Sequence, residues 1–311
     1  MTRATTQTSA PRVADLFAGW GGFSVGAELA GCRCVYAANH WRLAVQAHQA
    51  NLPHAQHACQ DLRQANWATL PDYDVLLAAP ACQGHSQASQ PKRRRYHDAL
   101  RATAWAVVDC ADVTEPKAIL VENVPDFLRW RLYPVWRSAL EQLGYQLTEH
   151  ILVASHHGVP QRRKRLFVVA MQGRSFEFDH RPTKEPSFGP HIDWQGGAWR
   201  PLGKATAGAQ TRIRAAQRRH GPRCLIQHVT GHKGLALSEP IRTITCQDQW
   251  AVVDGGRYRP LTIRETARAM GFPDDYLWPE GRRRDAIRGL GNAVCPPVAR
   301  DLVSQVTAQA A

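Results

Sequence analysis

Short apolar runs alternate with stretches of helical spacing through the first half of the chain. The strands predicted from this pattern cover residues 13–17, 34–38, 74–79 and 118–121, followed by two that look paired, at 145–154 and 165–171. The spacing of apolar residues between them predicts helices ending near residue 30 and at about 41–50, 99–113 and 136–143. This alternation is typical of a doubly wound α/β protein with a parallel, Rossmann-like sheet. Ligands bind such sheets beyond the carboxyl ends of the strands, so side chains there are the candidates for function.

The regular spacing is lost after residue 171. From 172 to about 239, Gly, Pro, Arg and His are frequent, which predicts a small second domain of irregular and β character. Regular patterns then return, with a strand at 241–245, a helix at 262–270 and a last helix at 296–308. The first of these helices is predicted to begin with a capping box formed by Thr262 and Glu265 and to end at Gly271.

The composition is that of a globular protein with a basic surface. Of 311 residues, 44% are hydrophobic and 21% are charged, and the formal net charge is +13. Such a basic excess favours a polyanionic partner such as nucleic acid, although arginine enrichment from a GC-rich genome would give the same excess. The polar residues 1–11 and the lack of a long apolar run predict no signal peptide and no membrane span.

Glycines cluster directly after the first predicted strand, in Asp15-Leu-Phe-Ala-Gly19-Trp-Gly21-Gly22-Phe-Ser-Val-Gly26. Glycine between a strand and a helix allows a tight turn and a close approach of ligand to backbone. The spacing is not that of a P-loop, and it departs from G-x-G-x-x-G, so a nicotinamide cofactor is disfavoured. On this segment alone, a nucleotide-like ligand and a plain structural turn remain equally open.

Eight cysteines are spread along the chain without C-x-x-C pairs and histidine partners, so we expect reduced thiols and no metal site. One of them, Cys82, follows the predicted strand 74–79 in Ala81-Cys82-Gln83-Gly84-His85-Ser86. A thiol on a loop at the carboxyl end of a strand is a candidate nucleophile, and the cationic run Lys92-Arg93-Arg94-Arg95 would favour its thiolate. A buried, unreactive thiol is the alternative, because most cysteines are core residues.

An acid occupies the corresponding place after the next strand. Glu122 directly follows residues 118–121, and the parallel sheet predicts that it lies at the same edge as Cys82. A carboxyl there could donate a proton or bind an amide edge. A helix-capping acid is the alternative.

A basic segment, Gln161-Arg162-Arg163-Lys164-Arg165, opens the last predicted strand of the first domain. Alternation along a strand places Gln161, Arg163 and Arg165 on one face, with Arg162 and Lys164 on the other. A basic face in contact with solvent is the simplest interpretation of this segment by itself.

Together these segments resemble the ordered motif set of DNA cytosine-5 methyltransferases. The resembling segments, in chain order, are Asp15–Gly22, Ala81–Gln83, Glu122–Val124, Gln161–Arg165, Arg264–Asp274 and Gly291–Val294. Each motif alone is weak, but their order and spacing along nearly the whole chain are very specific.

The resemblance implies both a fold and partners. It implies a Rossmann-like catalytic domain at 1–171 that binds S-adenosylmethionine, a target-recognition domain at 172–240, and a return segment at 241–311 that completes the catalytic domain. The implied partner is double-stranded DNA, and the protein is expected to be a monomer. A cytoplasmic, bacterial or phage-encoded enzyme of restriction–modification type follows from the same resemblance.

The resemblance also implies a covalent mechanism. Cys82 would attack C6 of cytosine, Glu122 would bind the N3 and amino edge and protonate N3, and Arg165 would steady the ring and its O2. Arg163 is implied to support the same pocket. These contacts cannot form inside a stacked duplex, so the cytosine must be flipped out.

Two further groups of residues follow from the matched motifs and from the basic segments. The expected cofactor-binding residues are Asp15, Phe17, Gly19, Gly21, Gly22, Asn39, His40, Trp41, Asp61, Pro80, Asn292 and Val294. The expected DNA-binding residues are Gln83, Ser86, Lys92, Arg93, Arg94, Arg95, Gln161, Arg212 and Arg214.

The chain departs from the family pattern in places. Ala81 stands where a second proline is usual, and His85 stands where Phe is common. Asn39 stands where an acid usually holds the ribose hydroxyls, and an amide can bond a hydroxyl only without charge, which predicts weaker cofactor binding.

Three other functions stay open at this point. A tRNA cytosine-5 methyltransferase shares the motifs, but the Cys-Phe-Thr sequence that such enzymes tend to carry is absent. An inactive DNA-binding paralogue is disfavoured by the intact Cys82, Glu122 and Arg165. An enzyme that transfers another group to cytosine is motivated only by Asn39.

Overall fold

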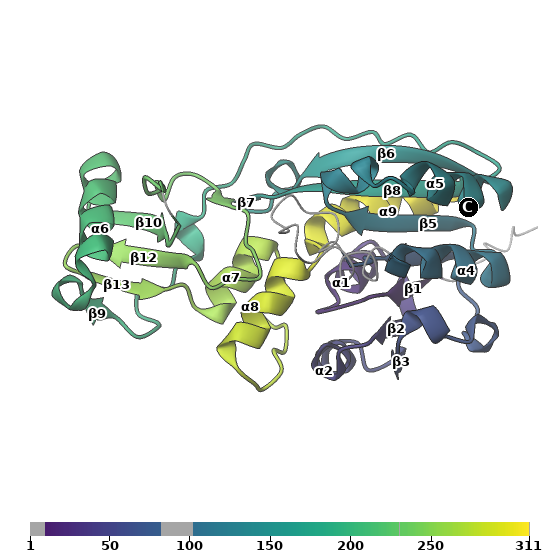
Figure 1. Cartoon of the computed structure of the whole chain (residues 1–311), viewed down its shortest axis with the longest axis horizontal. Coiled ribbons are helices and arrows are strands. Elements are labelled where there is room, and N and C mark those ends of the chain that lie inside the picture. The colour runs from purple at the N-terminus through teal and green to yellow at the C-terminus, as the bar shows by residue number, and fades with distance from the viewer. Residues whose placement is uncertain (1–9, 82–101, 230, 311) are drawn as a thin grey trace, which may run out of the picture. The chain divides into compact units, whose positions relative to one another are not determined.

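The computed structural model describes residues 10–81, 102–229 and 231–310. Within these residues the chain divides into two compact units (Figure 1). The large unit comprises Met1–Ile151, Arg165–Asp179 and Val298–Ala311, and the small unit comprises Leu152–Lys164 and His180–Pro297. Both units are discontinuous, so the chain passes between them several times.

A seven-stranded sheet forms the centre of the large unit, in the order β3-β2-β1-β4-β5-β8-β6. Its strands are β1 (Arg12–Leu16), β2 (Arg33–Asn39), β3 (Gln56–Cys59), β4 (Val75–Ala78), β5 (Ala118–Asn123), β6 (Tyr145–Val153) and β8 (Lys164–Gln172). The first five are parallel to their neighbours, whereas β8 is antiparallel to β5. The strand order reverses between β1 and β4, so the switch point at which such sheets bind ligands lies beyond the ends of these two strands. The predicted Rossmann-like class is confirmed.

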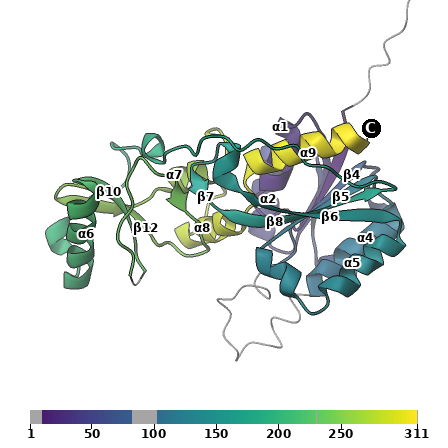
Figure 2. The same ribbon diagram turned by 90° about the horizontal axis from the view of Figure 1, so that it is seen from above.

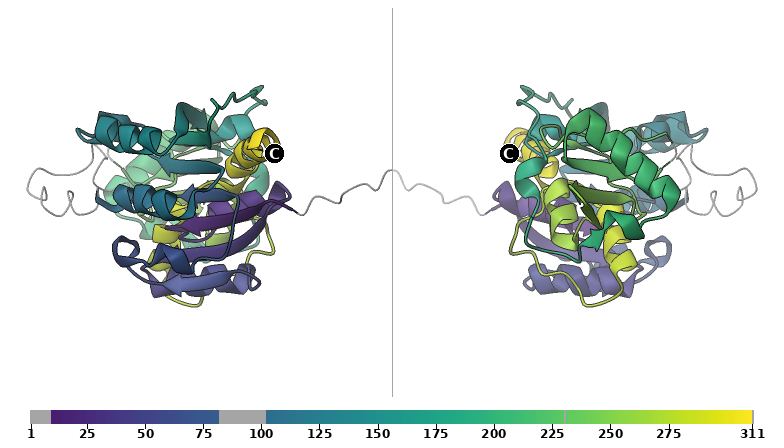
Figure 3. Two further views of the ribbon diagram at one scale, coloured as in Figure 1. Left: turned by 90° about the vertical axis from the view of Figure 1, so that its right-hand side faces the viewer. Right: turned by 90° about the vertical axis from the view of Figure 1, so that its left-hand side faces the viewer.

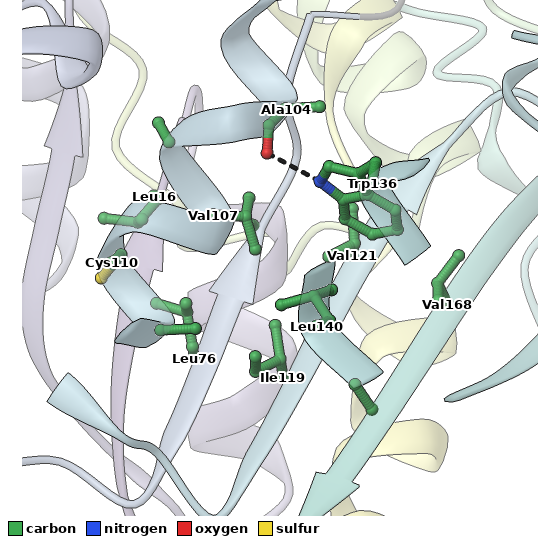
Figure 4. Close-up of a cluster of buried hydrophobic side chains, with 14 of the residues drawn as sticks. Leu16, Leu76, Ala104, Val107, Cys110, Ile119, Val121, Trp136, Leu140 and Val168 are labelled. Atoms are coloured by element: carbon green, nitrogen blue, oxygen red, sulfur yellow. Dashed lines mark hydrogen bonds between the residues drawn. The ribbon is translucent and has the colours of Figure 1, made fainter. Parts of the chain in front are cut away.

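Helices cover both faces of the large sheet, with α1 and α9 on one face and α4 and α5 on the other (Figure 2). The α-helices are α1 (Gly22–Leu29), α2 (Arg42–Asn51), α4 (Trp105–Thr114), α5 (Tyr133–Gln142) and α9 (Pro296–Ala310). The 3₁₀ helices are η1 (Leu62–Gln64), η2 (Trp67–Thr69), η5 (Ala102–Ala104) and η6 (Pro125–Arg129). Buried Val107 and Trp136 of the helices pack against Ile119 and Val121 of the sheet, and Trp136 Nε1 donates to the carbonyl of Ala104 at 2.9 Å (Figure 4). None of the described helices is long and apolar enough to cross a membrane.

The strands and helices predicted for the large unit are present, with small shifts at their ends. Strand β3 was missed because its sequence, Gln56-His-Ala-Cys59, contains no apolar run. The helix predicted at 99–113 is described from residue 102 onward, as η5 followed by α4, and residues 99–101 lie outside the described part of the chain.

The small unit contains an antiparallel sheet in the order β10-β12-β13-β9, with α6 packed against it (Figure 3). The elements of this unit are η7 (Ala154–His157), β7 (Gln161–Arg162), η8 (Gly189–His191), β9 (Arg200–Pro201), η9 (Leu202–Lys204), α6 (Ala207–His220), β10 (Arg223–Gln227), β11 (Ile241–Arg242), β12 (Trp250–Asp254), β13 (Arg257–Pro260), α7 (Ile263–Met270) and α8 (Arg283–Asn292). Ile213 and Ala216 of α6 pack on Cys224, Ile226 and Val253 of the sheet.

The expectation that residues 172–240 are irregular and β in character was incomplete, because this region also contains the fourteen-residue helix α6. Only Ala209, Ile213 and Ala216 of α6 are buried, and so narrow an apolar stripe gives a weak helical period. The strand predicted at 241–245 is shorter than expected, since β11 ends at residue 242 and pairs with β7.

The predicted capping box of α7 is confirmed. Thr262 Oγ1 accepts from the backbone N–H of Glu265 at 3.1 Å, and Glu265 Oε2 accepts from that of Thr262 at 2.7 Å. The helix ends at Gly271, whose φ of +79° is in the left-handed region. Glu265 also forms a fully buried, bidentate ion pair with Arg259 at 2.7 Å. The cap and the ion pair together bind β13 to α7 inside the small unit.

Candidate active site

The glycine-rich turn follows β1 at the switch point of the large sheet. The backbone has positive φ at Phe17 (+61°), Gly19 (+56°) and Gly21 (+70°). Glycine adopts this region without strain, but a phenylalanine there costs about 1–3 kcal/mol. The turn is held by hydrogen bonds from the N–H of Ala18 to Ala38 at 3.1 Å and from the N–H of Gly21 to Ala18 at 2.8 Å. A strained backbone maintained in this way is typical of a ligand-binding turn.

Asp15 lies beneath this turn and is completely buried. Its Oδ2 accepts from the Ser24 hydroxyl at 2.6 Å and from the Ser24 N–H at 3.2 Å, which ties the end of β1 to α1. Its Oδ1 is buried and has no hydrogen-bond partner among the described residues. Burial raises the pKa of this carboxyl to about 7, and the bonds from Ser24 offset only part of that rise. Its described contacts support the turn from below.

The residues after β2 provide polar and aromatic groups beside the turn. Asn39 is buried, and its Oδ1 accepts from the N–H of Trp41 at 2.9 Å, so its NH₂ group is the part available as a donor to a ligand. The ring of Trp41 packs against that of Trp20, with centroids 5.1 Å apart. His40 is exposed. This segment therefore has an aromatic surface and a neutral hydrogen-bonding group, which are the elements of a nucleoside site.

Asp61 and Pro80 are the last two residues of the large unit that the sequence predicts to bind the cofactor. Asp61 caps η1 through the N–H of Arg63 and forms an ion pair with its guanidinium at 2.6 Å. The hydrogen bonds from Arg63 lower the pKa of this carboxyl to about 2, so it is ionised at neutral pH. Pro80 is buried after β4, and its carbonyl accepts from Asn123 Nδ2 at 3.2 Å.

Glu122 and Arg165 meet at the end of β5. Arg165 Nε lies 3.1 Å from Glu122 Oε1, and the two side chains are only 18% and 7% exposed. The next residue, Asn123, bonds the carbonyl of Pro80 and so fixes the end of β4 beside that of β5. Ala81, which follows Pro80, donates its N–H to Thr103 Oγ1 at 3.2 Å. The parallel strands β4 and β5 thus bring Glu122 to the edge from which the chain continues into residue 82, and the antiparallel strand β8 brings Arg165 to the same edge.

Seven of the expected site residues lie outside the described part of the chain. They are Cys82, the predicted nucleophile, and six predicted DNA contacts, namely Gln83, Ser86, Lys92, Arg93, Arg94 and Arg95. Their assigned roles stay predictions.

Two residues of the basic segment are buried inside the small unit. Gln161 is fully buried, its Oε1 accepting from the N–H of Ile244 at 2.7 Å and its Nε2 donating to the carbonyl of Ala269 at 2.8 Å. Arg163 is 2% exposed and donates to the carbonyls of Ile244, Gly291 and Ala293 at 2.9–3.1 Å. The DNA contact expected of Gln161 does not fit this placement, because its amide is consumed in holding the small unit together. Arg163 likewise joins backbone segments there.

The remaining expected residues are also in the small unit. Asn292 is exposed and accepts from the Cys246 thiol at 2.9 Å, and Val294 is buried. Arg212 and Arg214 are exposed on α6, on either side of the buried Ile213. Helix α6 carries no acidic residue, so the charged side chains that it exposes are all basic.

The sequence did not single out three residues that the structure places at the turn. Trp20, Ser24 and His48 are all buried, and each packs against the glycine-rich segment or the residues beneath it. The glycine-rich motif includes Trp20, which was a usable signal. His48 lies 24 residues from its partner Ser24, and nothing in the sequence connects the two.

A mostly parallel sheet that carries a strained glycine-rich turn at its switch point, and a largely buried acid–arginine pair at the end of β5, is typical of an α/β enzyme that acts on a nucleotide-like ligand. The sequence model of the family described as C-5 cytosine-specific DNA methylase matches residues 11–192 and 203–308. The chain belongs to this family, and the resemblance inferred from the motifs is confirmed. The family is one of cytosine-specific DNA methyltransferases, and the chain is by membership an enzyme of this kind.

Relatives extend over almost the whole chain. Type II methyltransferase M.NlaX from Neisseria lactamica is 30% identical over 313 residues, which are 96% of each protein. Type II methyltransferase M.BsuFI from Bacillus subtilis is 33% identical over 293 residues, 91% of this chain and 69% of the relative. Among solved structures, DNMT2 from Spodoptera frugiperda aligns with a TM-score of 0.71 at 16% identity, covering 96% of this chain and 100% of that one. The last likeness shows the shared fold.

Proposed function

We propose that the chain transfers a methyl group from S-adenosylmethionine to C5 of a cytosine in a specific sequence of double-stranded DNA, with Cys82 as the nucleophile. The observation that carries the proposal is the largely buried Glu122–Arg165 ion pair at the edge where β4 leads into residue 82. The family match and the Type II relatives support DNA as the substrate.

The residue types suit this chemistry. C5 of cytosine is a poor nucleophile, so the Cys82 thiolate would add to C6 and move the electrons of the C5–C6 double bond towards C5. Glu122 would hydrogen-bond the N3 and amino edge and deliver a proton to N3, which accepts charge as the adduct forms. Arg165 fixes the Glu122 carboxyl through their ion pair, and its guanidinium would hydrogen-bond O2 of the ring. After methyl transfer, loss of the C5 proton and of the thiolate would restore the aromatic ring.

The base must leave the helix for this reaction. Glu122 binds the edge of cytosine that pairs with guanine in a duplex, and thiolate attack needs access to the face of the ring. We therefore propose that the cytosine is flipped out of the duplex and held at the ends of β4 and β5.

The residues at the switch point suit the proposed cofactor. Gly19, Gly21 and Gly22 leave room for a ligand at the turn, Trp41 offers an aromatic face, and Asn39 offers a donor. S-adenosylmethionine would supply an activated methyl group on a sulfonium. The proposed roles of Phe17, His40, Asp61, Pro80, Asn292 and Val294 in this site rest on the family motifs.

The proposed DNA-recognition region is 172–240, between the catalytic segments 1–171 and 241–311. It supplies β9, α6 and β10, and β12 and β13, which follow residue 240, complete the same small sheet. The exposed arginines of α6, including Arg212 and Arg214, would contact phosphates, and the net charge of +13 fits a polyanion. A monomeric protein in the bacterial cytoplasm is proposed on the same family grounds.

The test is to incubate the protein with mixed-sequence duplex DNA and isotopically labelled S-adenosylmethionine, digest the DNA and identify the nucleosides by mass spectrometry. We expect labelled 5-methyldeoxycytidine with the wild type and none with Cys82→Ser. Parallel reactions with tRNA form the second arm. Labelled 5-methylcytidine in tRNA without any DNA product would overturn the proposed substrate, and no product in either arm would overturn the activity.

A further inference from the structure

A chain of hydrogen-bonded side chains lies beneath the glycine-rich turn. The Ser24 hydroxyl on α1 is 2.6 Å from Asp15 Oδ2 on β1 and 2.9 Å from His48 Nε2 on α2. His48 Nδ1 is in turn 2.8 Å from His57 Nε2 on β3. Three of the four side chains are buried, and His57 at the far end is half-buried. Four elements of the large unit, β1, α1, α2 and β3, are therefore joined by this series of hydrogen bonds, in which His48 is the central link.

His48 also touches the turn directly. A Cβ atom built on Gly21 would lie 2.8 Å from His48 Cδ2 and 3.2 Å from Nε2, and Gly21 has the left-handed φ of +70°. The imidazole thus fills the space below Gly21, and any side chain at position 21 would collide with it. The buried imidazole is fixed by its two hydrogen bonds, so the backbone of the turn rests on a rigid plane.

The hydrogen bonds define one arrangement of protons when Asp15 is ionised. The Ser24 hydroxyl then donates to the carboxylate, so its oxygen must accept from His48 Nε2–H. A neutral His48 with its proton on Nε2 has a bare Nδ1, which accepts from His57 Nε2–H. Burial lowers the pKa of His48 to about 3, so the imidazole stays neutral at any working pH. Both ring nitrogens of His48 therefore have a hydrogen-bond partner.

We propose that His48 is a positioning residue for the cofactor: through Ser24 and Gly21 it holds the glycine-rich turn in its ligand-binding conformation. The proposal rests on the proposed function, in which this turn binds S-adenosylmethionine. The turn contains three positive-φ residues, one of them Phe17, and the N-cap of α1 is Gly21, which has no side chain to cap the helix. Without the support from His48, the turn also adopts other backbone conformations. The apparent cofactor affinity is then reduced in proportion to the fraction of molecules whose turn keeps the binding conformation.

The experiment is a calorimetric titration of the full-length protein with S-adenosylhomocysteine, the stable demethylated product. His48→Phe keeps a planar ring under Gly21 and removes both hydrogen bonds, and His48→Gln keeps an amide donor for Ser24. Leu140→Ala, in the α5 core on the opposite face of the sheet, is the control for general destabilisation. Ser24→Ala, which removes one hydroxyl, serves as the second variant should His48→Phe not fold.

We expect His48→Phe to raise the dissociation constant about tenfold and to retain one site per molecule, because the turn would hold its binding conformation in about a tenth of the molecules. His48→Gln should recover part of the affinity, Ser24→Ala should lose about threefold, and Leu140→Ala should lower the melting temperature without changing the dissociation constant. In turnover, the KM for the methyl donor should rise in His48→Phe while kcat at saturation is kept.

An unchanged dissociation constant in both His48→Phe and Ser24→Ala, with only a lower melting temperature or fewer binding sites, would overturn the positioning role and leave the proposed function intact. No binding by the wild type would instead remove the proposed cofactor, and this role with it.

Discussion

Arg165 Nε lies 3.1 Å from Glu122 Oε1, in a pair of side chains that are almost withdrawn from solvent. The two residues come from antiparallel neighbours in the sheet, in which Glu122 pairs with Phe167, two positions beyond Arg165. A substrate that reaches the Glu122 carboxyl therefore meets an acid whose orientation is already fixed by a guanidinium, a preorganised arrangement of the kind that catalysis requires.

The first prediction concerns this pair. Glu122→Gln keeps the shape of the side chain but cannot deliver a proton to N3, so the rate of methyl transfer should fall about 10²–10⁴-fold. DNA affinity should change little. Rapid-quench single-turnover measurements and a DNA titration separate the two effects. A variant that retains a third or more of the wild-type rate would show that Glu122 is not the proton donor.

A second prediction concerns pH and the buried Asp15. Its pKa is raised from 3.8 to about 7 by burial, so over the interval between these values the folded protein holds a proton that the unfolded chain has lost. The stability from this proton is present below pH 3.8 and is lost as the pH rises through about 7. The melting temperature of Asp15→Asn relative to wild type should therefore rise as the pH increases from about 5.5 to about 8.5.

Asp61→Asn is the matched control for the pH experiment. Its carboxyl has a pKa lowered to about 2 and is ionised in both folded and unfolded chains above pH ~5.5, so its difference from wild type should be flat across the same interval. A flat difference for Asp15→Asn as well would mean that the Asp15 carboxyl is ionised throughout.

The third prediction concerns Asn39. Its Oδ1 is used by the N–H of Trp41, so only its NH₂ is available to a ribose hydroxyl. In Asn39→Asp one carboxylate oxygen can keep the Trp41 bond while the other accepts from a hydroxyl with the added strength of charge. Affinity for S-adenosylhomocysteine should improve about three- to tenfold, a gain of up to ~1.4 kcal/mol. Weaker or equal binding in calorimetry would mean that residue 39 does not hold the ribose.

The exposed arginines of α6 give the fourth prediction. If Arg212 and Arg214 neutralise phosphates, the double alanine variant should bind DNA more weakly, and the slope of log K against log salt should decrease by about two. Arg300→Ala, an exposed arginine of α9, is the control and should leave the slope unchanged. Fluorescence anisotropy across a salt series measures both. An unchanged slope in the double variant would place the DNA elsewhere.

The central strands of the large sheet could be predicted from the sequence, but its edge strand β3 and the helix α6 of the small unit could not. The runs at Val75–Ala78 and Ile119–Val121 are apolar because these strands are covered on both faces, and such runs are easily recognised. Strand β3 lies at the edge of the sheet and is half exposed, so its sequence carries no such signal. Helix α6 was missed for a related reason, since it buries only a narrow stripe against a small sheet.

The candidate site shows the same limit at the level of single residues. Alternation placed Gln161 and Arg163 on one face, and the structure agrees, since both are buried while Arg162 and Lys164 are exposed. Alternation cannot say whether that face meets DNA or a core, and here it meets backbone carbonyls of the small unit. The contact of His48 with Gly21 depends on how α2 packs beneath the turn, which no local pattern records.

The central claim is the covalent bond between Cys82 and C6 of cytosine. Bisulfite sequencing of DNA modified by the enzyme gives the target site, and a duplex with 5-fluorocytosine at that site is then incubated with the enzyme and S-adenosylmethionine. Fluorine cannot leave C5 as a proton does, so the adduct should persist. We predict a protein–DNA conjugate by intact mass spectrometry, with the nucleotide mapped to the Cys82 peptide and no conjugate from Cys82→Ser. Methylation of ordinary DNA without any such conjugate, or a conjugate at another cysteine, would contradict the account.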